Sequence, residues 1–100
     1  MKLLTEELKR RLPPLYSQEN EADPMVICKF FDPTGSFTWF ILEFDGKDLF
    51  FAQVYSSLCP EGELGYVSLA ELQSVKGRFG LGIERDIWFK SCKLSECKGK

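Results

Sequence analysis

The sequence predicts an α+β domain with an N-terminal helix, a four- to five-stranded, mainly antiparallel sheet, and a second helix before the last strand. Two patterns support this prediction. Apolar and aromatic runs separated by short turns fill the middle of the chain, which is typical of antiparallel strands. Helix-capping residues precede two short amphipathic segments, one on each side of this region. One hundred residues suffice for one core, so we expect a single domain over residues 1–100.

The first predicted element is a short helix that begins after Thr5. Threonine is a good N-cap, and Glu6 and Glu7 in the first turn complement the positive end of the helix dipole. Leu8 supplies an apolar face, and the Pro-Pro pair that follows ends the helix. The next segment, YSQENEADP at residues 16–24, is polar and ends in proline, so it is predicted to be a surface linker.

Three consecutive antiparallel strands are predicted next. They are residues 25–31 (MVICKFF), 36–44 (SFTWFILEF) and 48–55 (DLFFAQVY), joined by the turns DPTG and DGK. The middle strand is apolar on both faces, so we expect either that both faces are covered or that one is free for a partner. By strict alternation, Glu43 falls on the face of Trp39 near the end of this strand.

The last third of the chain is predicted to hold one more helix between two strands. Ser68 and Glu71 match a capping box, and Gly77 is a natural helix end. In the final strand, Ile87 and Phe89 are expected to point inward. The predicted segments are a loop at 56–63 (SSLCPEGE), a strand at 64–67 (LGYV), a helix at 69–76 (LAELQSVK) and a strand at 86–90 (DIWFK).

Composition argues against several chemistries. The chain has no histidine, which removes the commonest general base and metal ligand, so we predict that it is not an enzyme. Of the four cysteines only Cys92 and Cys97 are close together, and Cys28 is expected to be buried, so neither metal nor cofactor is predicted. No apolar run approaches the ~20 residues that cross a bilayer, and residues 1–16 contain no apolar segment of secretory length, so we expect no secretory leader. We therefore expect a cytoplasmic protein without a membrane partner.

Charge is distributed unevenly along the chain. Residues 1–75 contain six Lys and Arg against twelve Asp and Glu, a net of −6, whereas residues 76–100 contain seven against three, a net of +4. The basic quarter could contact nucleic acid, but we favour the interpretation that it lies against the acidic remainder of its own chain. An acidic surface that binds a basic protein partner is equally permitted. The candidate nucleic-acid contacts are Arg78, Lys90, Lys93 and Lys98.

The segment GLGIERDIWF places three charges between apolar residues. Its glycines are preceded by a helix and followed by a strand, the reverse of a phosphate loop, so we expect them to serve a tight connection with positive φ. Arg85 is expected to act as a structural clasp by pairing with a carboxylate such as Glu43, Glu63 or Glu84. Glu84 and Asp86, about 7 Å apart on one strand face, are the alternative acid/base pair.

Five stretches together resemble a bacterial family, domain of unknown function 2958. They are KLLTEELKRRLPPLY, KFFDPTGSFTWF, EFDGKDLFFAQV, ELGYVSLAEL and GLGIERDIWF, and they span Lys2 to Phe89. This resemblance implies a setting on plasmids, conjugative elements and other mobile DNA, and it implies no particular activity. The cysteines are not part of the family pattern. The residues that carry both the pattern and a candidate binding role are Trp39, Glu43, Tyr66, Glu84, Arg85 and Asp86.

We therefore expect a small, non-enzymatic protein–protein interaction module of bacterial mobile genetic elements such as plasmids, conjugative elements or phages. Such a module could regulate transfer or inhibit a host defence system. One alternative is a nucleic-acid-associated accessory protein that uses the basic C-terminal quarter. The other is a small hydrolase that uses Glu43, Glu84 and Asp86.

Overall fold

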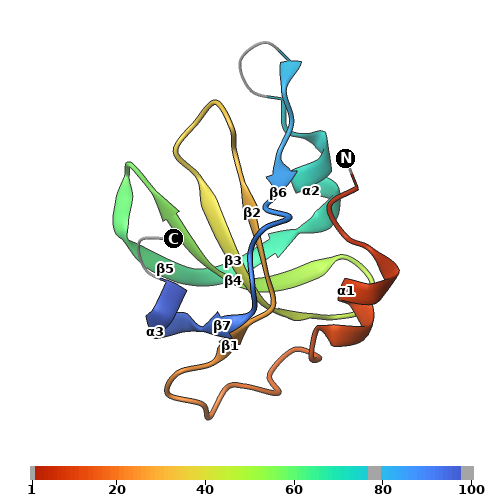
Figure 1. Ribbon diagram of the computed structural model, residues 1–100, viewed down its shortest axis with the longest axis vertical. Helices are drawn as coiled ribbons and strands as arrows, with labels where there is room; N and C mark the ends of the chain where they lie inside the picture. The colour runs from red at the N-terminus through yellow and green to blue at the C-terminus, as the bar shows by residue number, and fades with distance from the viewer. Residues whose placement is uncertain (1, 77–79, 98–100) are drawn as a thin grey trace.

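Residues 2–76 and 80–97, which the computed structural model describes, form two sheets and three short helices (Figure 1). The helices are α1 (Glu6–Arg11), α2 (Leu69–Ser74) and α3 (Leu94–Cys97). The strands are β1 (Met25–Val26), β2 (Cys28–Phe31), β3 (Thr38–Phe44), β4 (Leu49–Ser56), β5 (Cys59–Ser68), β6 (Glu84–Arg85) and β7 (Cys92–Lys93). The five-stranded sheet has the order β5-β4-β3-β2-β6 with antiparallel neighbours, and β1 pairs with β7. The predicted α+β class, the N-terminal helix and the helix before the last strand of the large sheet are confirmed.

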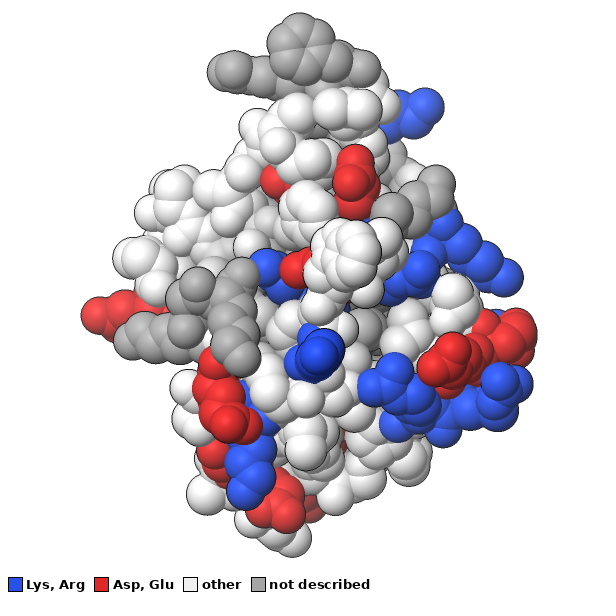
Figure 2. All heavy atoms as spheres, in the orientation of Figure 1, with Lys and Arg blue, Asp and Glu red and all other residues white. Residues whose placement is uncertain are grey.

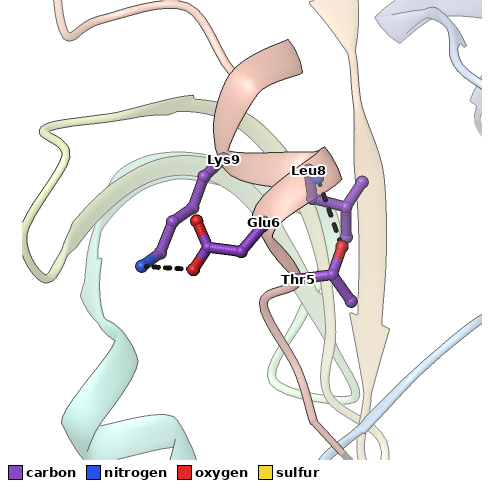
Figure 3. A network of polar contacts seen from close by, with 4 residues as sticks. All are labelled: Thr5, Glu6, Leu8 and Lys9. Carbon is purple, nitrogen blue, oxygen red and sulfur yellow. Dashed lines mark hydrogen bonds and ion pairs between the residues drawn. The ribbon is translucent and has the colours of Figure 1, made fainter.

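Helix α1 begins at the predicted cap. The Thr5 hydroxyl oxygen accepts a hydrogen bond of 3.2 Å from the backbone N–H of Leu8, and Glu6 forms an ion pair of 3.5 Å with Lys9 (Figure 3). The ion pair is exposed and therefore contributes little to stability. The buried side chain of Leu8 contributes more, because it anchors this short helix on the sheet.

Both faces of the large sheet are covered by other parts of the chain. On one face the N-terminal segment, α1 and α2 form a core with β2, β3 and β4, which includes Ile41 and Phe50. On the other face α3 and the segment before it form a second core, in which Cys97 packs with Phe40 and Leu42. The two-sided apolar pattern of β3 therefore reflects a central strand that is covered on both sides.

Strand β3 departs from strict alternation near its end. Its register against β4 shifts between Ile41 and Glu43, which indicates a β-bulge. The extra residue places Phe44 in the same core as Ile41 and turns Glu43 to the opposite face, toward Phe51. The expectation that Glu43 shares the face of Trp39 was therefore wrong, because alternation fails across a bulge.

The predicted loop at 56–63 is mostly strand. Ser56 pairs with Cys59, so the connection between β4 and β5 shrinks to a turn at Ser57 and Leu58, and the side chain of Leu58 is 91% exposed. Proline and glycine suggested a loop, but β5 is an edge strand, where Pro60 is tolerated because its missing N–H is not needed for pairing. Helix α2 is shorter than predicted and ends at Ser74, with the Ser68 cap in place.

The predicted final strand DIWFK is wrong. The pairing to β2 comes from Glu84–Arg85, and the chain turns immediately afterwards. The carboxylate of Asp86 accepts a hydrogen bond of 2.9 Å from the backbone N–H of Trp88, and the N–H of Phe89 donates to the carbonyl of Asp86. This turn leaves Ile87 exposed, contrary to the prediction, while Phe89 packs inward as expected.

The C-terminal segment closes the fold in a way that the sequence did not predict. The predicted strand at 25–31 is divided into β1 and β2, and β1 pairs with β7 through Met25 with Lys93 and Val26 with Cys92.

The connection from α2 to β6 contains the glycine-rich link. Gly80 has φ 72° in this connection, as expected, while Gly77 lies outside the described residues. None of the helices in the described ranges is long and apolar enough to cross a membrane.

Candidate functional site

The candidate binding residues lie in two separate places. The three charged residues of GLGIERDIWF lie at the β6 edge of the sheet, whereas Glu43 and Tyr66 line a hollow beside β5. Trp39 belongs to neither place. Its side chain is only 9% exposed and stacks on the ring of Phe37 with centroids 5.5 Å apart, so it is mainly a core residue.

Arg85 joins the sheet edge to the N-terminal segment. Its guanidinium donates hydrogen bonds to the carbonyls of Lys2, at 2.8 Å, and Leu3, at 3.2 Å. The acceptors of these two hydrogen bonds are main-chain oxygens, and the expected pairing of Arg85 with Glu84 stays a prediction. Glu63 lies on β5, at the opposite edge of the sheet, and the Glu43 carboxylate binds backbone amides elsewhere. A guanidinium that bridges two carbonyls holds the first residues of the chain against β6.

Asp86 is engaged with its neighbours on β2 as well as with its own turn. Its carboxylate lies 3.6 Å from the ammonium of Lys29, and its backbone N–H donates to the Lys29 carbonyl at 2.9 Å. The same ammonium lies 5.9 Å from the centroid of the Phe40 ring. These contacts fix the start of the turn that presents Ile87 and Trp88.

The three carboxylates of the hydrolase hypothesis are not brought together. Glu84 pairs with Phe31, which in turn pairs with Thr38 at the beginning of β3. Glu43 lies five residues farther along that strand, a separation of roughly 17 Å at the rise of an extended chain. Glu43 also faces a different hollow from that of Glu84 and Asp86. The geometry therefore provides no shared acid/base centre for these groups.

The turn after β6 carries the most exposed aromatic side chain of the described residues. Trp88 is 85% exposed and Ile87 is 60% exposed. Beside them lies an open depression of about 380 Å³, whose floor includes Phe31. Together, residues 84–88 form what we call the Trp88 surface: an apolar tip with Glu84, Arg85 and Asp86 at its base.

A second hollow, also of about 380 Å³, lies between the 16–24 loop and β5. Glu43 forms part of its wall although its side chain is only 3% exposed, and each of its carboxylate oxygens accepts a backbone hydrogen bond of 2.8 Å, from Tyr16 and from Gln18. Tyr16 has φ 70°, an unfavourable conformation for a residue with a side chain. The Glu43 carboxylate therefore stabilises a strained loop residue and places the Tyr16 ring at the rim of the hollow.

Tyr66 lies across the hollow from the loop. Its ring packs on Phe51 with centroids 5.1 Å apart, and about half of its surface is exposed. The pKa of Tyr66 is raised, chiefly by a hydrogen bond to the Tyr16 side chain, and also by burial and the nearby negative charges of Glu43 and Glu19. Tyr16 of the loop and Tyr66 of β5 thus both line the hollow that the buried Glu43 helps to form. Tyr16 was not among the predicted binding residues, because nothing in the sequence signals its backbone conformation.

Comparison with known protein families gives a match that covers nearly the whole chain. The model of the family described as "Protein of unknown function (DUF2958)" matches residues 3–97. The chain belongs to this family. Searches of curated proteins and of solved structures give no match. Family membership confirms the resemblance seen in the sequence, and it assigns no activity to this DUF2958 protein.

Two of the four candidate nucleic-acid contacts can be placed in this DUF2958 protein. Lys90 and Lys93 are exposed, whereas Arg78 and Lys98 lie outside the described residues. Lys93 helps to lower the pKa of Asp23, after the larger effects of hydrogen bonds from Ser95. In the face shown in Figure 2, basic side chains are interspersed with acidic ones, notably over α1. Helix α1 belongs to the first three quarters of the chain, so the interpretation that the basic quarter lies against acidic parts of its own chain stays a prediction.

The cysteines of the DUF2958 protein are free thiols. Cys28 is buried as predicted, and burial raises the pKa of its thiol to about 12. Cys97 is also buried and donates to the Lys93 carbonyl at 3.4 Å, while Cys92 is only partly covered. Within the described part of the chain, no three His, Cys, Asp or Glu side chains are grouped so as to hold a metal ion.

Proposed function

We propose that this DUF2958 protein is a small, non-enzymatic protein–protein interaction module of bacterial mobile genetic elements, and that the Trp88 surface is its main contact site. The mobile-element setting rests on the plasmids and conjugative elements with which the family resemblance is associated. The observation that carries the interaction role is the 85% exposure of Trp88 at the tip of an ordered turn. Regulation of transfer or inhibition of a host defence system would both use such a surface.

The exposure of Trp88 supports binding because tryptophan, tyrosine and arginine are the residues that most often dominate interface energies. Isolated apolar residues are common on protein surfaces. Here, however, Ile87 adjoins Trp88, and the depression beside them offers room for a partner side chain. A partner bound at this site would cover the indole ring of Trp88, which is exposed to solvent in the protein alone.

The turn is also held in a fixed conformation before any partner arrives. The Asp86 carboxylate accepts a hydrogen bond from the backbone N–H of Trp88 and forms an ion pair with Lys29. Arg85, the last residue of β6, donates a hydrogen bond to the N-terminal segment. A surface that is already ordered loses less conformational entropy on association. The charged residues of this segment therefore support the apolar tip, which makes the direct contact.

The proposal is tested by affinity capture from a native host, with and without nuclease treatment. We expect Trp88→Ala to lose the captured protein and the wild type to retain it after nuclease treatment. Leu58→Ala is the matched control, since Leu58 is 91% exposed at the β4–β5 turn and does not line the depression beside Trp88. Recovery of nucleic acid alone, with no protein partner, would overturn the proposal in favour of the nucleic-acid alternative.

A further inference from the structure

The hollow beside β5 has the chemistry of a cation-binding site. We propose that it binds the side chain of an arginine or lysine from a protein partner. This inference rests on the proposed function, because it names the chemistry of one contact of the interaction module, but it concerns a different site from the Trp88 surface. The lining residues on which it depends are Tyr16, Glu19, Glu21, Glu43, Phe51 and Tyr66.

Acidic residues give the hollow a negative character. Three acidic residues, Glu19, Glu21 and Glu43, line the hollow, and its described lining includes no Lys or Arg. Glu43 is 3% exposed and binds two backbone amides, and neither ion pair found among residues 2–76 and 80–97 involves it. A buried charge is screened less by water than a surface charge, so its attraction for a cation is stronger.

Aromatic side chains form part of the wall of the hollow. Tyr16 and Tyr66 are 62% and 52% exposed, and Phe51 packs behind Tyr66. Aromatic faces attract guanidinium and ammonium groups, and long basic side chains can lay their methylene stems on apolar surface while the charge reaches an acid. Leu64, 55% exposed beside Tyr66, extends the apolar surface for such a stem.

Hydrogen bonds already fix the loop that forms the other wall of the hollow. Gln18 donates through its side chain to the carbonyls of Met25 and Leu42, and its side-chain oxygen accepts the N–H of Met25 at 2.8 Å. With the two amide bonds to Glu43, these contacts hold the loop between β1 and β3. The hollow is therefore an ordered feature, and a ligand need not organise it on binding.

The electrostatic character of the hollow also decides which ligands it excludes. Glu19, Glu21 and Glu43 surround the rim on which Tyr66 lies, and the charges of Glu43 and Glu19 add to the rise in the pKa of Tyr66, after the larger effects of the Tyr16 hydrogen bond and burial. An acidic side chain or a phosphate would meet this potential and would be repelled. The negative potential of the hollow thus favours a cation and disfavours nucleic acid at this site.

The test uses the full chain labelled with ¹⁵N and an acetylated, amidated peptide of sequence Ala-Arg-Ala-Arg-Ala. We expect saturable shift changes at the amides of Gln18, Glu19, Leu64 and Tyr66, with weaker binding at high salt. The matched peptide carries citrulline, which keeps the shape of arginine without its charge, and it should bind at least fivefold more weakly. Spermidine is the third probe, because a free polyamine offers cations without a peptide.

Two double variants distinguish binding at the hollow from a general effect of the net charge of the protein. Glu19→Gln with Glu21→Gln should weaken the arginine peptide at least fivefold, whereas Glu61→Gln with Glu63→Gln, an equal charge change at exposed positions outside the hollow, should change it less than twofold. Tyr66→Leu should also weaken binding, since it keeps apolar area and removes the aromatic face.

Equal binding of the citrulline peptide, or equal losses in both double variants, would overturn the inference. Spermidine binding as tight as the peptide's would overturn the choice of a protein side chain as the source of the cation. Trp88→Ala should leave the affinity for the arginine peptide unchanged within twofold. A failure at this hollow is therefore distinguishable from a failure of the Trp88 surface.

Discussion

The Glu43 carboxylate provides the sharpest test of how this fold is held together. It is 3% exposed, and its two oxygens accept hydrogen bonds of 2.8 Å from the backbone amides of Tyr16 and Gln18. Glu43→Gln keeps the size of the side chain but replaces one acceptor with an N–H₂ group, which faces a backbone donor. One charge-assisted bond is lost and the other becomes neutral. We expect a loss of about 3 kcal/mol in the free energy of unfolding.

A loss of this size is measurable in a domain of 100 residues. It lowers Tm by about 15 °C and leaves the chain folded at room temperature, since small domains have about 5–15 kcal/mol of stability. Urea denaturation gives the free energy, and hydrogen exchange shows whether the amides of Tyr16 and Gln18 lose protection. Glu63→Gln, an exposed control on β5, should change stability by less than about 0.5 kcal/mol. If Glu43→Gln matches this control, or if both amides stay protected, Glu43 does not hold the loop.

Three further predictions follow from other contacts. Arg85→Met should lower the free energy of unfolding by about 2 kcal/mol, measured in urea, because it removes two hydrogen bonds to Lys2 and Leu3; an unchanged midpoint would refute the clasp. Cys28 should react with iodoacetamide at pH 8 at least a hundredfold more slowly than Cys59, measured by mass spectrometry, because its pKa of about 12 and its burial suppress the thiolate. Equal reaction rates of Cys28 and Cys59 at pH 8 would contradict the burial of Cys28. The raised pKa of Cys28 also contributes stability that is present below pH 9 and is lost as pH rises toward 12. Hydrogen bonds from Ser95 lower the pKa of Asp23, so its contribution is present above its ordinary pKa of 3.8 and is lost as pH falls below it. Asp23→Asn should therefore flatten the fall of urea midpoints below pH 4, and an unaltered slope would refute this linkage.

The parts of the fold that local chemistry determines could be predicted from the sequence. Thr5 and Ser68 cap their helices as the N-cap pattern predicts, because a capping hydroxyl needs only the next three residues. The DGK turn is likewise local, since the Asp45 carboxylate accepts the backbone N–H groups of the three residues from Lys47 to Leu49. Strand order along β2, β3 and β4 follows from short turns between them.

What could not be predicted depends on contacts between distant segments. The bulge that redirects Glu43 is a feature of the β3–β4 pairing, and no residue type marks it. Alternation placed Ile87 inside, but the Asp86 turn interrupts the strand and exposes Ile87 and Trp88. The sequence suggested a carboxylate partner for Arg85 and did not suggest the carbonyls of Lys2 and Leu3, which the N-terminal segment brings to the sheet edge.

The central claim is that Trp88 contributes directly to binding a protein partner. The most direct measurement is the affinity of the purified, captured partner for the wild type, for Trp88→Ala and for Leu58→Ala, with the fold of each variant checked by circular dichroism. The account predicts that Trp88→Ala raises Kd at least tenfold while remaining folded, as expected for a dominant interface residue, and that Leu58→Ala changes Kd less than twofold. Equal affinities for all three proteins would contradict the claim that the Trp88 surface is the contact site.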